Sequence, residues 1–373
     1  MQKVVHFIHG LNTGGAETLV KDYALLLDKE KYDIQILCYE HSDSPYEKLL
    51  RDSGINVIYV CDKMPFYGKK SIFAKIINRI MQYMLIRRSI RKLAPDILHT
   101  HLIVNRYVKF SRPHPKTRII HTVHNEPKKL WFNGKKERTK DLQAAKWLVK
   151  HYQMQFVVLH EKMRSEVNAL FDVTNTIVLN NGIHYSKFEK IRSREIVRQD
   201  LRIPENAFVM GHVGRFTLQK NHRFLVEIFS EVYKRKNNAY LLMIGDGVEK
   251  QKIVDQLSEF ALQGKYQILS NRLDIPDLLN AMDVFVFPSL FEGLGIAVIE
   301  AQKMKLPCVV SDQVPDAAGI SNLVRFEKLS SSSEEWAEQV CTFSPKQVEY
   351  YNAEAWDMKN VILKLQDIYQ GEI

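Results

Sequence analysis

Short apolar segments alternate with longer amphipathic segments along almost the whole chain, and this alternation restricts its fold more than any other feature. Apolar runs with the length and composition of buried strands fall into two series. The first lies at residues 4–8, 34–39, 57–60, 97–99, 119–123, 156–159 and 176–179, and the second at 208–213, 240–244, 266–269, 284–287 and 308–310. Helical patterns, such as those over 16–27 and 72–93, lie between the strands. Strands that alternate with helices predict parallel sheets built from right-handed crossovers.

Two such series predict an α/β protein with two doubly wound, Rossmann-like domains. The length of 373 residues also favours two domains over one. The polar stretch 185–206 joins the two series. We therefore expect one domain at residues 1–185 and a second at 186–345. A wholly helical segment at 346–373 is expected to close the fold and to pack back towards the first domain.

The composition is that of a globular protein, with 45% hydrophobic and 26% charged residues, which excludes a disordered or fibrous chain. Four cysteines lie far apart without a metal-ligand spacing, which predicts free thiols in a reduced compartment: Cys38, Cys61, Cys308 and Cys341. The first apolar run is too short for a signal peptide, and the longest one, 72–86, is interrupted by Lys75 and Arg79. These features predict a cytoplasmic protein.

The net charge of +10 is distributed unevenly, because residues 1–185 hold 30 basic and 17 acidic side chains. A basic balance suits nucleic acid, an anionic membrane surface or a phosphorylated ligand, and it does not choose among them. Residues 69–92 carry eight basic side chains and no acidic one.

This basic segment has two interpretations. Apolar residues recur in it at helical spacing, namely Ile72, Phe73, Ile76, Ile77, Ile80 and Met84. Such a helix can lie on an anionic bilayer, with its cations at the phospholipid headgroups. It can equally be an ordinary domain helix that packs its apolar face on the sheet. The absence of acidic residues brings the first interpretation level with the second, and both remain open.

A glycine-rich loop follows the first strand and opens a helix. In the sequence from Gly10 to Glu17, Gly14 and Gly15 would let backbone N–H groups approach a phosphate at the helix N-terminus. The loop lacks the Lys-Ser/Thr of a P-loop, and its spacing is not that of a dinucleotide-binding fingerprint. A tight structural turn is the alternative interpretation.

A second phosphate-binding pattern follows the strand at 208–213. Arg215 and Lys220 come after Gly214, at the carboxyl end of that strand, where open α/β sheets bind their ligands. Two cations beside a glycine-containing turn can balance the charge of a diphosphate without a metal ion. A solvated lysine is the alternative.

The most specific segment runs from Phe287 to Ala301. Its strand is expected to end at Pro288, and a helix to begin near Gly295. Glu292 then lies in the turn and Glu300 within the helix, so the two carboxylates can accept hydrogen bonds from hydroxyl groups at two points of one extended ligand. The N–H groups of the turn can bind a phosphate.

With these motifs the chain resembles the retaining GT-B glycosyltransferases, a family that includes bacterial capsule, exopolysaccharide and mannosyl transferases. The resemblance covers most of the chain and is carried by G-G-A-E at 14–17, P-D-I-L-H-T-H at 95–101, H-T-V-H-N at 121–125, L-N-N-G-I at 179–183, G-R-x(4)-K-N at 214–221, G-D-G at 245–247 and E-x(7)-E at 292–300. Residues 214 to about 337 look most like the exopolysaccharide and capsule transferases of Gram-positive bacteria. The fold this implies is GT-B, with two domains that face a cleft.

The resemblance also implies roles for the residues that match its motifs. Gly14 and Gly15 would bind the donor, with Gly15 facing its β-phosphate, and Arg215 and Lys220 would stabilise the diphosphate as it leaves.

Glu292 would bind hydroxyls of the transferred sugar, and Glu300 the ribose of the nucleotide. The N–H groups of the turn would lie near the phosphate; they belong to Gly293, Leu294 and Gly295. No metal and no cofactor other than the UDP- or GDP-linked sugar donor is expected.

His124, at the end of its strand, would lie beside the sugar and the reacting centre. His99, His101 and His121 also lie at strand ends, and each is either a hydrogen-bonded core residue or a functional group. The chain departs from the family pattern at Asn271, so the base that it binds is left open.

We therefore expect a retaining, metal-independent glycosyltransferase that uses a nucleotide sugar. Its acceptor is expected to be a polyprenyl-diphosphate-linked saccharide at the inner face of the cell membrane, where the basic first domain would bind anionic lipid. The alternatives are a nucleotide-sugar epimerase on the same fold and, more remotely, a basic nucleic-acid-binding protein. No nucleic-acid-binding module is visible in the sequence.

Overall fold

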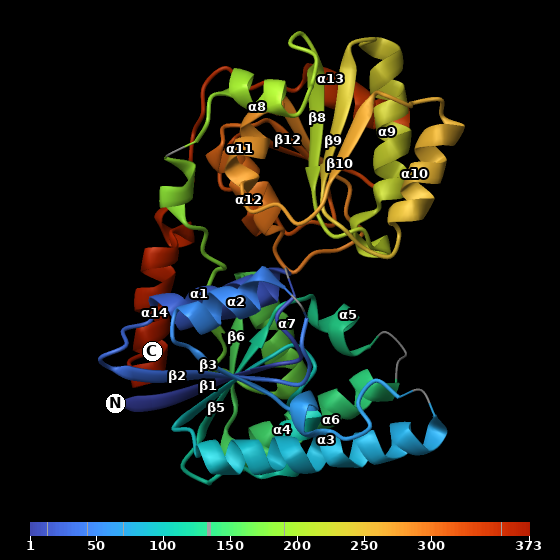
Figure 1. The fold of residues 1–373 in the computed structure, drawn as a ribbon. Helices are drawn as coiled ribbons and strands as arrows, with labels where there is room; N and C mark the ends of the chain where they lie inside the picture. The colour runs from blue at the N-terminus through green and yellow to red at the C-terminus, as the bar shows by residue number, and fades with distance from the viewer. Residues whose placement is uncertain (13, 43, 70, 133–135, 190, 352) are drawn as a thin grey trace. The chain divides into compact units, whose positions relative to one another are not determined.

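The structure is a computed structural model that describes residues 1–12, 14–42, 44–69, 71–132, 136–189, 191–351 and 353–373. These residues form two compact units (Figure 1). The first comprises Met1–Asn181 and Lys359–Ile373, and the second comprises Gly182–Met358.

The first unit contains a seven-stranded parallel sheet with the strand order β3-β2-β1-β4-β5-β6-β7. The strands are β1 (Gln2–Ile8), β2 (Tyr32–Cys38), β3 (Asn56–Tyr59), β4 (Ile97–His101), β5 (Arg118–Val123), β6 (Gln155–Val158) and β7 (Ile177–Val178). The helices are α1 (Gly15–Leu26), α2 (Pro45–Asp52), α3 (Ile72–Leu93), α4 (Asn105–Ser111), α5 (Pro127–Trp131), α6 (Lys136–Tyr152), α7 (Glu161–Phe171) and the C-terminal α14 (Met358–Gln370).

The second unit contains a six-stranded parallel sheet with the order β10-β9-β8-β11-β12-β13. The strands are β8 (Phe208–Val213), β9 (Ala239–Ile244), β10 (Tyr266–Leu269), β11 (Val284–Phe287), β12 (Cys308–Ser311) and β13 (Val324–Glu327). The helices are α8 (Arg194–Asp200), α9 (His222–Arg235), α10 (Lys250–Glu259), α11 (Ile275–Asn280), α12 (Ile296–Lys303) and α13 (Ser333–Thr342).

The sheet of the second unit is buried on both faces. Successive residues of a strand point to opposite faces, so Leu242 packs with α8, α11 and α12, whereas its neighbour Leu241 packs with α9, α10 and α13. This explains why the strands read as continuous apolar runs in the sequence. The predicted fold class, two doubly wound α/β domains with a C-terminal helix, is confirmed.

The sheet of the first unit is unusual in carrying polar side chains on its buried faces. His6 and His99 are paired on β1 and β4, and their rings lie against Tyr23 of α1. The ring of Tyr369 of α14 lies edge-on to that of His99. The C-terminal helix therefore belongs to the first unit.

One expectation about the chain's organisation needs correction. Residues 346–373 are not wholly helical, because Tyr350 forms a bridge with Ser321 and the regular helix begins only at Met358. Pro345 and the tyrosine pair at 350–351 suit an extended segment better than a helix. The stretch 185–206, which joins the two series of strands, contains helix α8, and this helix buries Val197 in the second unit, within the bounds expected for the second domain. The edge strand β13 was not predicted, since it is short and only half-buried.

In both sheets the strand order reverses next to the first strand, between β1 and β4 in the first unit and between β8 and β11 in the second. Ligands of open α/β sheets bind outside the carboxyl ends of the strands at such a reversal. The loop after β8 also lies directly against the G-D-G turn after β9. Gly214 N–H donates to Ile244 O at 2.9 Å, and Phe216 N–H donates to Asp246 O at 2.8 Å.

This close approach predicts that Gly245 cannot be replaced. Its φ is +151°, and a Cβ atom there would lie 2.0 Å from the carbonyl oxygen of Gly214. We expect Gly245→Ala to lower the free energy of unfolding by roughly 2–4 kcal/mol, because the backbone of the neighbouring loop must move. Gly264→Ala is the matched control, since Gly264 has a φ of +74° with open space around it. Equal losses in the two variants, measured by urea denaturation, would contradict the steric account.

Candidate active site

The candidate site of the second unit is an ion pair across the reversal of its sheet. Lys220, at the end of a short 3-10 turn after β8, donates from Nζ to Glu292 Oε1 at 2.7 Å. Glu292 lies after β11 and is only 6% exposed. The ammonium group of Lys220 also lies 4.5 Å from the ring centroid of Phe287. Two residues that are 72 positions apart in the sequence thus share one buried contact, as the sequence motifs require of a common site.

Gln219, which the sequence did not single out, ties the same two loops together. Its side-chain amide donates to Phe291 O at 2.9 Å, and its backbone carbonyl accepts from Leu290 N–H at 2.8 Å. The residue fixes Glu292 relative to Lys220 without being a ligand candidate itself. In the sequence, only its position directly before Lys220 indicates that Gln219 lies at this site.

Arg215 has a different environment from Lys220. It is exposed, and within the described residues it forms no ion pair. Its guanidinium group is therefore available to an anion from solvent, whereas the ammonium group of Lys220 is held by Glu292 until a competing anion arrives.

The turn after Glu292 leads into α12, as predicted. Gly293, Leu294 and Gly295 are buried, and Gly295 adopts a φ of +91° at the N-cap of the helix. A glycine is favoured there because other residues are strained in this conformation. Glu300 lies in the second turn of α12 and is half-buried.

In the first unit, Gly14 is the N-cap of α1 and Gly15 is its first residue. The carbonyl oxygen of Gly14 accepts hydrogen bonds from both the backbone N–H and the hydroxyl of Thr18, each at 2.8 Å. Ser44 of the next loop donates to Leu11 O. The glycine loop after β1 is thus held from two sides.

The loop after β2 is fastened by His41. One ring nitrogen contacts Glu47 and the other contacts Asp62, each at 2.9 Å. The hydrogen bond to Glu47 raises the pKa of His41. Cys61 also lies close to His41 and Asp62, and together they form a His/Cys/Asp cluster that was not predicted from the sequence. Burial raises the pKa of the Cys61 thiol, and both ring nitrogens of His41 already bind carboxylates, which makes the cluster a poor metal site. All four cysteines are free thiols.

His124 lies directly after β5 and is 8% exposed. Its Nε2 lies 3.0 Å from Nδ1 of His101. Its other ring nitrogen, Nδ1, is buried and has no hydrogen-bond partner among the residues described. Burial lowers the pKa of His124 to about 3, so its ring is neutral near pH 7.

The other histidines at strand ends are hydrogen-bonded core residues. His99 contacts Thr122 and Tyr369, while His101 contacts His6 and His124. His121 points to the opposite face of the sheet, where Asn105 Nδ2 lies 3.4 Å from its Nε2 and also donates to Asp141. His6, on β1, was not singled out in the sequence, although it lies two residues before the end of its strand.

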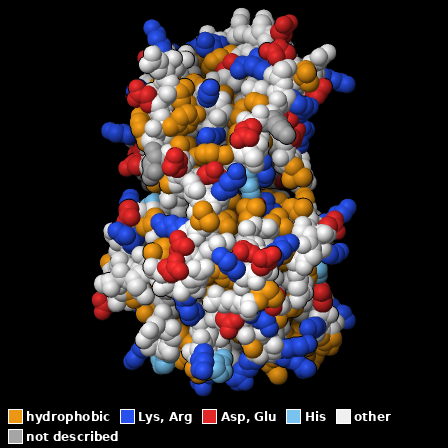
Figure 2. All heavy atoms as spheres, turned by 90° about the vertical axis from the view of Figure 1, so that its left-hand side faces the viewer, with side chains coloured by type: hydrophobic (Ala, Val, Ile, Leu, Met, Phe, Trp, Pro, Cys, Tyr) orange, Lys and Arg blue, Asp and Glu red, His pale blue; other side chains and the backbone are white. Residues whose placement is uncertain are grey.

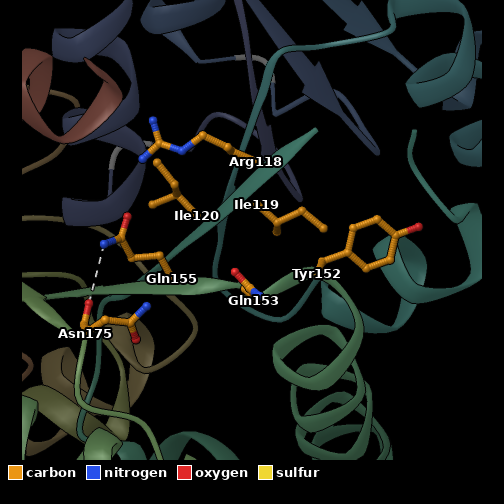
Figure 3. Close-up of a pocket in the computed structure, with 7 residues that line it drawn as sticks. All are labelled: Arg118, Ile119, Ile120, Tyr152, Gln153, Gln155 and Asn175. Carbon is orange, nitrogen blue, oxygen red and sulfur yellow. Dashed lines mark hydrogen bonds between the residues drawn. The ribbon is translucent and has the colours of Figure 1, made fainter. Parts of the chain in front are cut away.

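A small cavity of about 210 Å³ in the first unit contains none of the candidate residues. Figure 3 shows it at the start of strands β5 and β6, where Arg118 and Gln155 lie. This is the amino end of the sheet, opposite to the end at which open α/β sheets bind ligands. We therefore do not assign a function to it.

Helix α3 leaves most of its apolar residues uncovered. Of the six that the sequence pattern marks, only Ile77 is half-buried, and the other five are at least 56% exposed: Ile72, Phe73, Ile76, Ile80 and Met84. The helix packs on the unit through Ala74, Gln82, Ile86 and Ile90 instead. Figure 2 shows lysine and arginine side chains gathered along the lower edge of the first unit. No helix in the described part of the chain is both long and apolar enough to span a membrane.

Comparison with known proteins matches both units to glycosyltransferase families. Residues 13–187 match the model of Glycosyltransferase Family 4, and residues 193–323 match that of Glycosyl transferases group 1. The crystal structure of Anabaena Alr3699/HepE in complex with UDP and glucose shares the fold, with a TM-score of 0.76, 17% identity and complete coverage of both chains. The chain is therefore a glycosyltransferase of the GT-B class.

Within that class the chain is akin to capsule and exopolysaccharide enzymes. EpsF of Bacillus subtilis is 27% identical over 91% of this chain and 87% of its own length. The capsular polysaccharide biosynthesis glycosyltransferase CapH of Staphylococcus aureus is 23% identical over 100% of this chain and 99% of its own. An Escherichia coli enzyme is 28% identical over 77% of this chain and 73% of its own. It is named UDP-Gal:alpha-D-GlcNAc-diphosphoundecaprenol alpha-1,3-galactosyltransferase.

The Lys220–Glu292 contact predicts strong energetic coupling between the two side chains. We expect Lys220→Met to destabilise the protein by about 2–4 kcal/mol, because it leaves a buried carboxylate unpaired. The double variant Lys220→Met/Glu292→Gln should be less destabilised than the sum of the single variants by about 1 kcal/mol or more. The more exposed pair Arg223–Glu227 is the control and should show almost no coupling. Additive losses at Lys220 and Glu292 would mean that the pair does not form in solution.

Proposed function

We propose that this glycosyltransferase moves a sugar, with retention of anomeric configuration and without a metal ion, from a nucleoside-diphosphate sugar to a lipid-linked saccharide. The observation that carries this proposal is the Lys220–Glu292 pair at the reversal of the second sheet, with the exposed Arg215 on the same loop. The second unit would bind the donor and the first unit the acceptor. The UDP in the HepE structure and the UDP-Gal in the name of the Escherichia coli enzyme support a nucleotide-sugar donor.

In this proposal different residues bind different parts of the donor. The diphosphate would take Lys220 from its pair with Glu292 and would also bind Arg215, so that two cations balance the charge that grows on the leaving group. Released from Lys220, the carboxylate of Glu292 can accept hydrogen bonds from sugar hydroxyls. The backbone N–H groups of the turn at residues 293–295 would bind a phosphate oxygen at the start of α12. Glu300 would bind the ribose, and Gly14 and Gly15 would also contribute to donor binding.

In a single-step transfer, retention requires the acceptor oxygen to attack the face that the diphosphate leaves. The bond from the anomeric carbon to the phosphate oxygen breaks and its electron pair stays with the diphosphate. The new bond to the acceptor oxygen forms on the same face, and the acceptor proton passes to the departing phosphate oxygen. This route needs stabilised negative charge on the phosphate, which the two cations supply, and it needs no metal-bound oxygen.

Nucleotide binding tests the donor site directly. With EDTA present, UDP or GDP at about 100 times its dissociation constant should stabilise the protein by roughly 2.7 kcal/mol. We expect one base to give this shift and the Arg215→Ala/Lys220→Ala variant to lose most of it. The control variant Arg223→Ala/Lys252→Ala removes two exposed cations of the same unit and should keep the shift. A shift that needs a divalent ion would contradict metal independence.

Product analysis tests the reaction itself. With the nucleotide sugar and a lipid-linked saccharide, the anomeric coupling constant of the product should show the configuration of the donor. Conversion of the nucleotide sugar without any acceptor would instead favour an epimerase. Inversion of configuration would contradict the retaining mechanism.

The acceptor proposal rests on the exposed face of α3. Five uncovered apolar residues and a basic segment without acidic side chains suit the headgroup region of an anionic bilayer. The diphosphoundecaprenol in the name of the Escherichia coli enzyme supports a lipid-linked acceptor at such a surface. The protein would then work as a peripheral enzyme at the inner face of the cell membrane.

Vesicle sedimentation tests this membrane contact. We expect the protein to sediment with phosphatidylglycerol vesicles at low salt and to be released as salt screens the charges. Phe73→Ser/Ile76→Ser should reduce binding at least tenfold, because both side chains are exposed on α3. Leu363→Ser, at an equally exposed apolar position on α14, should bind like the wild type. Unchanged binding of the α3 variant would exclude this helix as the contact.

A further inference from the structure

A continuous row of hydrogen-bonding side chains runs through the core of the first unit and ends at His124. From that end, His124 Nε2 lies 3.0 Å from His101 Nδ1, and His101 Nε2 lies 3.1 Å from His6 Nδ1. His6 Nε2 lies 3.5 Å from the hydroxyl of Tyr369, which is the longest link.

The row continues from the same tyrosine hydroxyl. Tyr369 lies 2.7 Å from His99 Nδ1, and His99 Nε2 lies 2.7 Å from the hydroxyl of Thr122. In this row both ring nitrogens of His6, His99 and His101 therefore take part in hydrogen bonds, whereas His124 contributes only Nε2. The row joins strands β1, β4 and β5 to α14 on one face of the sheet.

All four imidazoles of this row are neutral near pH 7. Burial lowers the pKa of His6 and of His124 to about 3, and it lowers the pKa of His99 and of His101 well below 6.5. The tyrosines that face them, Tyr23 of α1 and Tyr369 of α14, have pKa values raised by burial and stay protonated. None of the four rings hydrogen-bonds to a carboxylate in the described part of the chain.

A neutral imidazole has one N–H donor and one acceptor nitrogen, so such a row must point in one direction throughout. In one direction His124 presents an unprotonated Nδ1, every ring donates towards Thr122, and the hydroxyl hydrogen of Thr122 is left over. In the other direction Thr122 donates to His99, every ring donates towards His124, and His124 presents a protonated Nδ1.

Thr122 decides between the two directions. It is 1% exposed, and His99 is its only hydrogen-bond partner among the described residues. If His99 donated to it, the hydroxyl hydrogen of Thr122 would be buried without an acceptor, which is unfavourable. If Thr122 donates, the unpaired hydrogen lies on His124 Nδ1. This atom is also buried, but it belongs to the more exposed side chain, 8% against 1%, at the carboxyl end of the sheet, where a ligand can bring an acceptor.

We propose that Thr122, His99, Tyr369, His6 and His101 form a one-way hydrogen-bond chain that holds His124 as a neutral donor at Nδ1. His124 then donates to an acceptor oxygen of the bound sugar, and it cannot remove a proton through that atom. The five other residues are positioning residues. This inference rests on the proposed function for the ligand of His124 and is independent of it for the state of the ring.

Nitrogen NMR of histidine-labelled protein reads the state of the ring without any substrate. With His124→Asn used to assign the signal, we expect His124 in the Nδ1–H form, without titration between pH 6 and pH 8. The Nε2–H form, or a titration near pH 6.5, would overturn the proposal. This result does not depend on whether the protein transfers a sugar.

Variants at the two hydroxyl groups test the direction of the chain. Thr122→Val removes its first donor and should reduce the Nδ1–H form of His124 to half or less. Thr100→Val makes the same change on the opposite face, where the hydroxyl lies 2.8 Å from His121, and should leave His124 unchanged. An unaltered His124 signal in folded Thr122→Val would overturn the role of Thr122.

Tyr369→Phe is a second variant that interrupts the chain at its centre. We expect it to lower kcat/KM about tenfold while the dissociation constant of the nucleotide stays the same. Tyr23→Phe removes a buried hydroxyl that has no hydrogen-bond partner in the described structure and should leave kcat/KM unchanged. Equal activity of the two variants would overturn the link between the chain and catalysis.

Discussion

The ion pair between Lys220 and Glu292 is the interaction on which the proposed donor site depends. A parallel sheet brings the loops after β8 and β11 to the same edge, but it does not fix their side chains. The ion pair and the two hydrogen bonds of Gln219 do so before any ligand is present. In the proposed donor site a diphosphate would displace Glu292 from Lys220, so binding of the phosphates and release of the carboxylate would become one event.

The first unit differs from the second because its sheet carries polar side chains on faces that are buried. His6, His99 and His101 are fully buried, and each uses both ring nitrogens within the core. Ring nitrogens of the three lie within 4.8 Å of one another, close enough to ligate a metal ion. Hydrogen bonds within the row already use both ring nitrogens of each of the three histidines, so an ion could bind there only by displacing them.

Most of the strands and their parallel arrangement could be predicted from the sequence because buried parallel strands are continuous apolar runs, as at 208–213 and 284–287. The positions of Lys220, Glu292 and Gly295 followed from motif spacing. The partner of Lys220 did not, because no sequence pattern encodes a contact across 72 residues. The role of His6 was also not predicted, because its hydrogen-bond partners lie far away in the sequence, on β4 and α14. The exposure of the apolar residues of α3 could not be predicted from the sequence either, because the same periodicity is found in helices whose apolar face is covered.

The return of α14 to the first unit has a consequence for how the chain is made. Tyr369 is buried against His99, and two backbone carbonyls of α14 accept hydrogen bonds from Arg118. These groups are synthesised only after the whole second unit. The site of Tyr369 in the nascent first unit therefore stays open to water until the second unit has been translated.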